Sequence, residues 1–141
     1  MILTPEKSLC DKNQAIVVSR DRGNFNQHRA TNPQRLYDLR HYKLDGDLVT
    51  QRTCCDYLLV NDSSRNAYLI ELKGANIDKA VEQLEAGEQI CRNELSGYRF
   101  FYRIVCNKVR THKVESNKVR KFRDKYGERL LIREKVYEET L

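Results

Sequence analysis

Two carboxylates and a lysine stand at the ends of consecutive apolar segments, where they can form a metal site. Asp56 opens one apolar run, and Glu71 and Lys73 close the next, beyond a polar turn. Side chains alternate between the faces of a strand, so Glu71 and Lys73 point the same way and Asp56 can meet them from the paired strand. Two carboxylates beside an amine are suited to holding a divalent cation and a water molecule.

These groups match the needs of phosphodiester hydrolysis. Magnesium prefers oxygen ligands and keeps several of its waters, so two carboxylates and one backbone carbonyl suffice. Asp56 and Glu71 are the candidate carboxylate ligands, and Leu72 can supply the carbonyl oxygen. Lys73 can orient the attacking water or hold the phosphate. The alternative is that the charges are solvated at an exposed strand end. The apolar run 67–72 favours a functional site, because unpaired buried charge is costly.

At these positions the sequence resembles the PD-(D/E)xK nuclease superfamily, which pairs an aspartate on one strand with an acid-x-lysine triplet on the next. Asp56 and the triplet 71–73 match, and Gln83 matches a glutamine that many members carry on the following helix. The resemblance covers about 48–106. It implies a restriction-endonuclease-like fold and cleavage of nucleic acid with Mg²⁺ or Mn²⁺. Relatives also place a glutamate on an N-terminal helix, a role for which this chain offers Glu6.

Composition describes a polar chain of one domain. A length of 141 residues predicts a single domain over 1–141, with its core at about 48–137. No run approaches the roughly 20 apolar residues that cross a bilayer, and no secretion signal is evident, so we expect a cytoplasmic protein. Five cysteines without CxxC pairs are expected as reduced, buried apolar residues rather than zinc ligands.

Basic residues gather in the C-terminal third of the chain and favour a nucleic-acid partner. The net charge is +6. Such surfaces attract phosphate backbones through counterion release. DNA is the expected partner, RNA is not excluded, and cleavage of a duplex predicts a homodimer. The alternative is a catalytically inactive module that binds nucleic acid or a protein through the same segment. The candidate contacts are Lys108, Arg110, Lys113, Lys118, Arg120 and Lys121.

Other residues have weaker claims to chemistry. Asp45 and Asp47 flank Gly46 in an expected turn and can each contribute a carboxylate. Tyr98, Phe100 and Tyr102 alternate along one expected strand, where core packing competes with stacking on bases.

The elements that must position these residues form an α/β fold with a central mixed β-sheet flanked by helices. The run 67–73 should be its central strand. Apolar spacing and end signals predict helices at 5–12, 76–95 and 115–126. The segment 21–33 is expected to be a loop. Strands are expected at 15–19, 36–44, 48–53, 55–60, 67–73, 98–106 and 130–137.

Overall fold

The computed structural model describes residues 1–23, 25–72, 76–108 and 116–141 of the chain. This part of the chain forms an α/β fold with two mixed sheets and two α-helices, together with three short 3-10 turns. No helix within it has the length and apolar character needed to cross a membrane. Its strands and α-helices are β1 (Ile16–Arg20), β2 (Gln27–Thr31), β3 (Leu39–Lys43), β4 (Tyr57–Asn61), β5 (Asn66–Glu71), α1 (Ile77–Cys91), β6 (Arg99–Cys106), α3 (Asn117–Tyr126), β7 (Leu130–Glu134) and β8 (Val136–Thr140).

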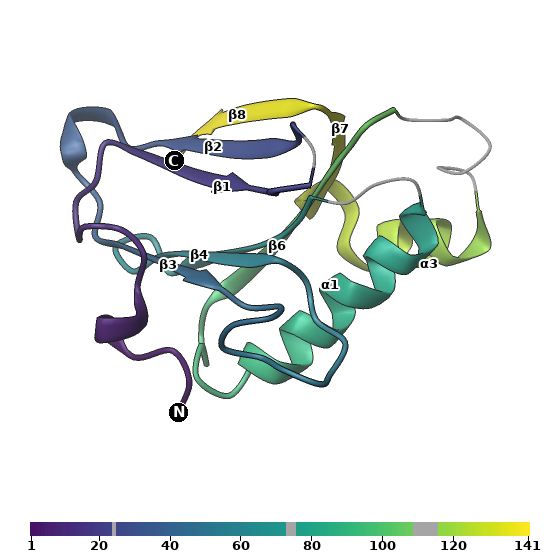
Figure 1. The fold of residues 1–141 in the computed structure, drawn as a ribbon, viewed down its shortest axis with the longest axis horizontal. Helices are drawn as coiled ribbons and strands as arrows, with labels where there is room; N and C mark the ends of the chain where they lie inside the picture. The colour runs from purple at the N-terminus through teal and green to yellow at the C-terminus, as the bar shows by residue number, and fades with distance from the viewer. Residues whose placement is uncertain (24, 73–75, 109–115) are drawn as a thin grey trace.

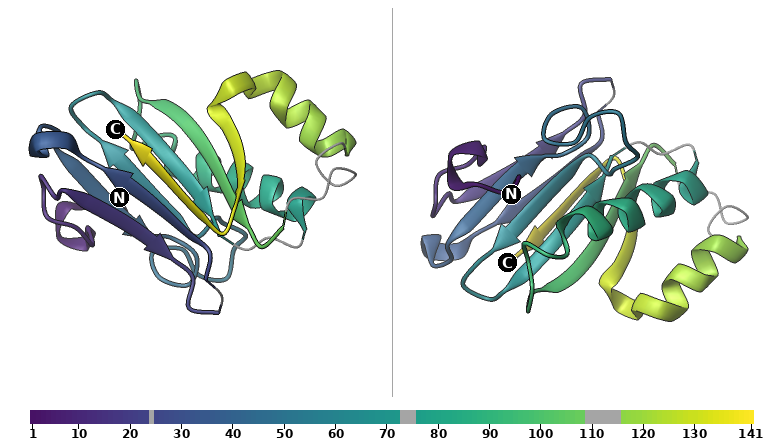
Figure 2. Two further views of the ribbon diagram at one scale, coloured as in Figure 1. Left: turned by 90° about the horizontal axis from the view of Figure 1, so that it is seen from above. Right: turned by 90° about the horizontal axis from the view of Figure 1, so that it is seen from below.

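A five-stranded sheet lies between two different layers. Its strand order is β3-β4-β5-β6-β7, so β5 has the central position that its apolar sequence predicts. Helices α1 and α3 cover one face, and the three-stranded sheet β1-β2-β8 covers the other (Figure 1). The two views of Figure 2 show both helices together on one side of the sheet. The expectation of a sheet flanked by helices therefore holds for one face only.

Many elements meet at the end of the large sheet where β5, β6 and β7 finish, which we refer to as the carboxyl end. These three strands are parallel, whereas β4 is antiparallel to both β3 and β5. Lys43, the last residue of β3, is therefore paired with Tyr57, the first residue of β4. The turn between β1 and β2 reaches the same end, because the Tyr57 hydroxyl donates to the Arg20 carbonyl oxygen at 2.9 Å.

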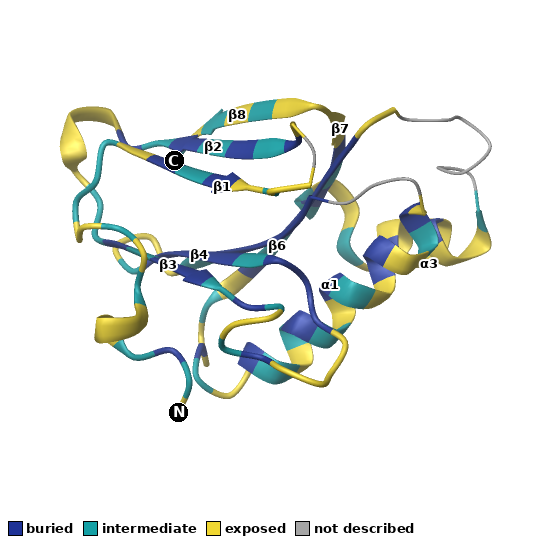
Figure 3. Cartoon of the chain, in the orientation of Figure 1, coloured by how far each residue is buried: buried dark blue, intermediate teal, exposed yellow. Residues whose placement is uncertain are grey.

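Separate hydrophobic cores fill the two faces of the central sheet (Figure 3). Along β5, Ala67 and Leu69 belong to the core under the helices, while Tyr68 and Ile70 belong to the core between the sheets. Glu71 continues this alternation toward the helices and is fully buried. Helix α1 approaches closely there because it carries Gly87, where an added Cβ would lie 2.6 Å from the Cys55 sulfur.

Buried charges also lie between the two sheets, in what we refer to as the inter-sheet cluster: His28 of β2, Arg103 of β6 and Glu139 of β8. The Arg103 guanidinium donates twice to the Glu139 carboxylate, at 2.8 and 3.0 Å, and His28 Nε2 lies 2.5 Å from the same carboxylate. Burial by itself would raise the pKa of Glu139, but the hydrogen bonds from His28 and Arg103 outweigh it and lower that pKa to about 2. The carboxylate charge is therefore matched by cationic and donor groups.

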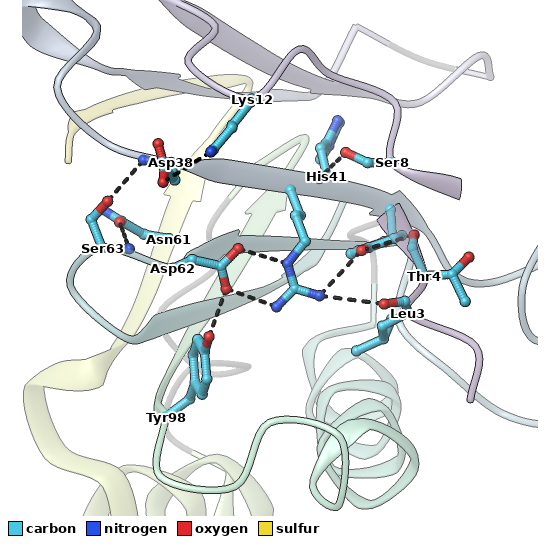
Figure 4. Close-up of polar contacts among 12 residues, drawn as sticks. Leu3, Thr4, Ser8, Lys12, Asp38, His41, Asn61, Asp62, Ser63 and Tyr98 are labelled. Atoms are coloured by element: carbon cyan, nitrogen blue, oxygen red, sulfur yellow. Dashed lines mark hydrogen bonds and ion pairs between the residues drawn. The ribbon is translucent and has the colours of Figure 1, made fainter. Parts of the chain in front are cut away.

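The N-terminal segment is fastened along β3 (Figure 4). The Arg40 guanidinium forms two 2.8 Å hydrogen bonds with the Asp62 carboxylate and donates to the Leu3 carbonyl oxygen. The Tyr98 hydroxyl donates to the same carboxylate at 2.6 Å. Farther along, Leu9 N donates to the His41 carbonyl oxygen and Leu39 N donates to the Lys12 carbonyl oxygen, so this segment runs antiparallel to β3.

Two expectations in the first half of the chain were wrong. The expected loop 21–33 contains β2, a strand whose inward side chains are His28 and Ala30. A buried histidine in place of an apolar residue hides the alternation that marks a strand. The segment 48–53 is not a strand, because Val49 makes only an isolated bridge and Gln51 has a φ of 60°.

Two further elements are shorter than expected. The expected strand 130–137 divides at Lys135, which has a φ of 59°. The Lys135 N–H donates to the carbonyl oxygen of Cys106 in β6, and the Lys135 carbonyl oxygen accepts from the N–H of Gln27 in β2. Lys135 is therefore the residue at which the chain passes from the large sheet to the small one. The expected helix 5–12 is only the 3-10 turn Pro5–Lys7. None of its side chains is buried, so no packing against the core stabilises a longer helix.

Candidate active site

Asp56 and Glu71, which we refer to as the acid pair, lie side by side at the carboxyl end of the sheet. The Glu71 carboxylate accepts a hydrogen bond from the backbone of Asp56. The Asp56 N–H donates to Glu71 Oε1 at 3.1 Å, and the Leu72 N–H donates to Asp56 Oδ2 at 3.0 Å. Antiparallel pairing of β4 with β5 produces this arrangement, since it sets the start of one strand beside the end of the other. The structure thus brings together the two carboxylates that the sequence predicted.

Burial makes the acid pair unusual. Asp56 is 5% exposed and Glu71 is 0% exposed. Two carboxylates held side by side in low dielectric repel each other, and each loses hydration. Lys43 contributes a cation from β3, but its ammonium lies 3.9 Å from Asp56 Oδ1 and also donates to the Asp45 carbonyl oxygen at 2.6 Å. A divalent cation would relieve the repulsion directly.

Gln83 reaches the acid pair from α1, as the sequence predicted. When its side-chain nitrogen faces the sheet, it donates to Glu71 Oε2 at 3.1 Å and to the Lys79 carbonyl oxygen at 3.3 Å. The opposite orientation gives a 3.5 Å contact with the Cys54 carbonyl oxygen instead. We assign the first orientation, because it gives both amide atoms suitable partners. Gln83 then fixes the rotamer of Glu71 from the helix side.

Of the other two residues of the predicted triplet, the structure describes only Leu72. Lys73 lies outside the described residues. The Leu72 carbonyl oxygen accepts a hydrogen bond from the Asn26 side chain at 2.8 Å, and the Leu72 side chain packs in the core between the sheets. One lone pair of the predicted carbonyl ligand is therefore used within the protein.

A cavity of about 580 Å³ opens beside Asp56. Among the described residues that line it, Arg20, Arg22 and Lys43 are basic. Its acidic lining residues include Asp21, Asp45, Asp47 and Asp56. The turn acids Asp45 and Asp47 thus share a cavity with Asp56, one member of the acid pair. Glu6 is exposed in the first 3-10 turn and is not one of the described lining residues.

Lys43 is the functional candidate that sequence reasoning missed. It stands at the end of the expected strand 36–44, and a direct hairpin to the strand that follows Asp56 would have placed it at the acid pair. The erroneous strand at 48–53 separated the two in the predicted order. In the structure Lys43 lies over the Tyr57 ring, 5.2 Å from its centroid. Its ammonium therefore faces the cavity wall.

The predicted nucleic-acid contacts fall at two places. Lys108 is exposed two residues beyond β6, at the carboxyl end of the sheet. Lys118, Arg120 and Lys121 are exposed on α3. Lys118 forms an ion pair with Glu82 of α1, which offsets part of its charge. Arg110 and Lys113 lie outside the described residues. None of the other four side chains is among the described residues that line the cavity beside Asp56.

Cysteine chemistry has little support in this part of the chain. All five cysteines are free thiols, and Cys54, Cys55, Cys91 and Cys106 are buried. Burial raises the pKa of Cys91 to about 12 and raises that of Cys106, so these thiols stay protonated near neutral pH. No group of three or more His, Cys, Asp or Glu side chains able to hold a metal ion occurs among the described residues.

Comparison of the chain with protein-family models, with curated proteins and with solved structures finds no match. Function has therefore to be inferred from the chemistry of the acid pair and its cavity.

Proposed function

We propose that this protein is a metal-dependent nuclease that hydrolyses phosphodiester bonds in DNA, built on the core arrangement of the PD-(D/E)xK superfamily. The observation that carries the proposal is the buried contact between Asp56 and Glu71 beside a cavity with basic side chains. The order of elements around it agrees, since β4 and β5 form a hairpin and α1 leads to a parallel β6. Gln83 on α1 fits the glutamine of the resemblance.

The acid pair suits Mg²⁺ or Mn²⁺. Each carboxylate oxygen can accept more than one contact, so the hydrogen bonds from Asp56 N, Leu72 N and Gln83 leave acceptor capacity. Asp56 lines the cavity, where substrate and water have access. Magnesium commonly binds to one or two carboxylates and completes its shell with waters and substrate phosphates. Asp56 and Glu71 would hold the ion, with the Leu72 carbonyl oxygen as a further ligand.

The chemistry is addition of water to phosphorus. A bond forms between the water oxygen and phosphorus, one ester P–O bond breaks, and the products are a phosphate monoester and a hydroxyl group. A bound cation would supply charge neutralisation and a more acidic water. Lys43 would place its ammonium on a non-bridging phosphate oxygen near Asp56. Gln83 would keep the Glu71 carboxylate in its rotamer.

The three basic side chains of the described cavity lining can contact a polyanionic substrate, although this lining also holds four aspartates, whose charge a bound cation would partly offset. Arg20 and Arg22 lie on its wall, and Lys108 is exposed at the same end of the sheet. Lysine and arginine in such positions attract phosphates in a salt-dependent way. DNA is the substrate proposed, with RNA as the competing polymer and a homodimer as the form that would cut both strands of a duplex.

The deciding experiment compares wild type with Glu71→Gln and Asp56→Asn. Linear duplex, single-stranded and branched DNA, and RNA, would be incubated with each protein in Mg²⁺, in Mn²⁺ and in chelator. Asp124→Asn is the matched control, because Asp124 is exposed on α3. We expect wild type and Asp124→Asn to cut only with metal, and both site variants to lose about 1000-fold or more in rate.

Cleavage that survives in both site variants would show that the activity does not come from the acid pair. Absence of cleavage by every protein, with salt-sensitive binding retained, would replace the nuclease by a catalytically inactive module for nucleic acid. In that case the residues to test are the exposed basic side chains of α3, Arg120 and Lys121.

A further inference from the structure

The turn between β1 and β2 carries an exposed aromatic side chain at the carboxyl end of the sheet. Phe25 is 91% exposed. Leu36, between β2 and β3, is another exposed apolar residue, at 64%, and serves below as a control. The aromatic residues that the sequence offered for base stacking lie elsewhere. Phe100 is 9% exposed and Tyr102 is 1% exposed, and both pack in the core under the helices. Phe25 is thus an exposed aromatic residue three positions from Arg22, which lines the cavity.

The turn is tied to the acid pair from both sides. At its start, the Arg20 carbonyl oxygen accepts a hydrogen bond from Tyr57, the residue after Asp56. At its end, the buried Asn26 side chain donates to the Leu72 carbonyl oxygen, the residue after Glu71. Phe25 is therefore adjacent in sequence to a residue whose side chain is fixed to the site.

Charge on the turn indicates what binds there. Arg20 and Arg22 both line the cavity beside Asp56. A guanidinium suits a phosphate oxygen, and an exposed aromatic ring three residues farther on suits a base. A phenyl ring can stack on a base only where that base is unpaired or at an end, since bases inside a duplex are already stacked on both faces.

We propose that this turn holds an unpaired base of single-stranded DNA on Phe25 and leads the adjoining phosphate past Arg22 into the cavity of the acid pair. The inference rests on the proposed nuclease function and narrows its substrate class to DNA with a single-stranded segment. It concerns binding, so it can be tested without cleavage.

The first measurement is affinity in the presence of chelator, where cleavage is stopped. A labelled single-stranded oligonucleotide and a hairpin-closed duplex would be titrated with wild type, Phe25→Ala, Phe25→Tyr and Leu36→Ala. Loss of one stacked base weakens binding by roughly 5- to 100-fold, and we expect that loss for Phe25→Ala on the single strand only. Phe25→Tyr and the matched control Leu36→Ala should bind like wild type. Circular dichroism would verify that each variant is folded.

The second measurement uses the absence of tryptophan from the chain. Phe25→Trp introduces a single indole, whose fluorescence should be quenched when a base stacks on it, whereas Leu36→Trp should be unaffected. The proposal is overturned if wild type does not bind the single strand, if Phe25→Ala binds it within twofold of wild type, if the duplex loses affinity equally, or if the indole is not quenched. Metal-dependent cutting with any of these results would leave the nuclease standing and remove only the role of Phe25. Quenching without cutting would do the reverse.

Discussion

The inter-sheet cluster and the acid pair are both groups of ionisable side chains inside the fold, but only the first balances opposite charges among its own members. Glu139 receives two hydrogen bonds from the Arg103 guanidinium and lies against His28. In the acid pair, the Asp56 N–H donates to Glu71, the Leu72 N–H donates to Asp56, and the Lys43 ammonium lies 3.9 Å from Asp56 Oδ1. The first group thus compensates its charge among its own members, whereas the second places two like charges together.

The difference separates a structural role from a functional one. A balanced cluster contributes when intact and is costly to break, because removing one partner leaves the other buried and unpaired. Two like charges cost stability as long as nothing lies between them. The fold therefore depends on the inter-sheet cluster, whereas it would tolerate neutralisation of the acid pair. The experiments below test this contrast.

Removal of the inter-sheet cation should have the largest effect. Arg103→Met leaves the Glu139 carboxylate buried without its guanidinium, and we expect a loss of about 3 to 5 kcal/mol in the free energy of unfolding. Denaturant unfolding followed by circular dichroism measures it. Arg99→Met is the control, since Arg99 is exposed on the same strand. A loss below about 1 kcal/mol for Arg103→Met would mean that the inter-sheet cluster is not balanced in the way described.

Acid should destabilise the region between the sheets in two steps. Burial lowers the pKa of His41 from 6.5 to about 4, so the unfolded chain binds its proton first and stability falls between about pH 6.5 and 4. The pKa of Glu139 is lowered to about 2, so its contribution is retained above about pH 4.5 and lost between there and pH 2. The loss from His41 alone is up to about 3 kcal/mol.

His41→Gln tests the upper step. Its free energy of unfolding, measured from pH 8 to pH 4, should depend less on pH than that of wild type, whatever its absolute stability. An unchanged pH profile would show that another group titrates in this range. Ser19 contacts His41 Nε2 at 2.9 Å, so Ser19→Ala is a matched variant that disturbs the contact and leaves the titrating ring in place.

Much of the fold could be predicted from local patterns, and the failures have physical causes. The central strand and the basic helix were expected close to where they occur, and the helix expected at 76–95 occurs as Ile77–Cys91, because apolar periodicity and end signals are local. The second sheet was not expected at all. Its inward positions include buried Ser19 and His28 and half-buried Glu139, which have polar partners on distant strands. Such burial leaves no apolar alternation in the sequence.

The acid pair and Gln83 were predictable because the spacing of two strands and a helix brings them together. Lys43 was missed because its contact with Asp56 depends on direct pairing of β3 with β4. The strand wrongly expected at 48–53 hid that pairing. Asn26 and Phe25 could not be found from pattern, because their roles depend on the turn between β1 and β2 reaching a different sheet. Long-range packing decides that, and local sequence does not.

Metal should stabilise the protein through the acid pair alone. At a Mg²⁺ or Mn²⁺ concentration ten times the Kd, binding to the folded state raises the free energy of unfolding by about 1.4 kcal/mol. Glu71→Gln should lose this gain. Glu139→Gln should keep it, although it is less stable overall. Denaturant unfolding with and without metal gives each difference, and an equal gain in all three proteins would locate the metal elsewhere.

Neutralising Glu71 should have the smallest effect on stability, in contrast to Arg103→Met. In Glu71→Gln the side-chain oxygen still accepts from Asp56 N, and Gln83 can turn its amide to satisfy the new NH₂ group. Relief of like-charge repulsion offsets the weaker hydrogen bonds, so in chelator at pH 7 the free energy of unfolding should stay within about 1 kcal/mol of wild type. A loss above about 2 kcal/mol in the free energy of unfolding would show that the fold depends on the Glu71 charge, as it is expected to depend on Arg103. A variant that is stable yet inactive would instead show that the fold keeps this carboxylate for its chemistry.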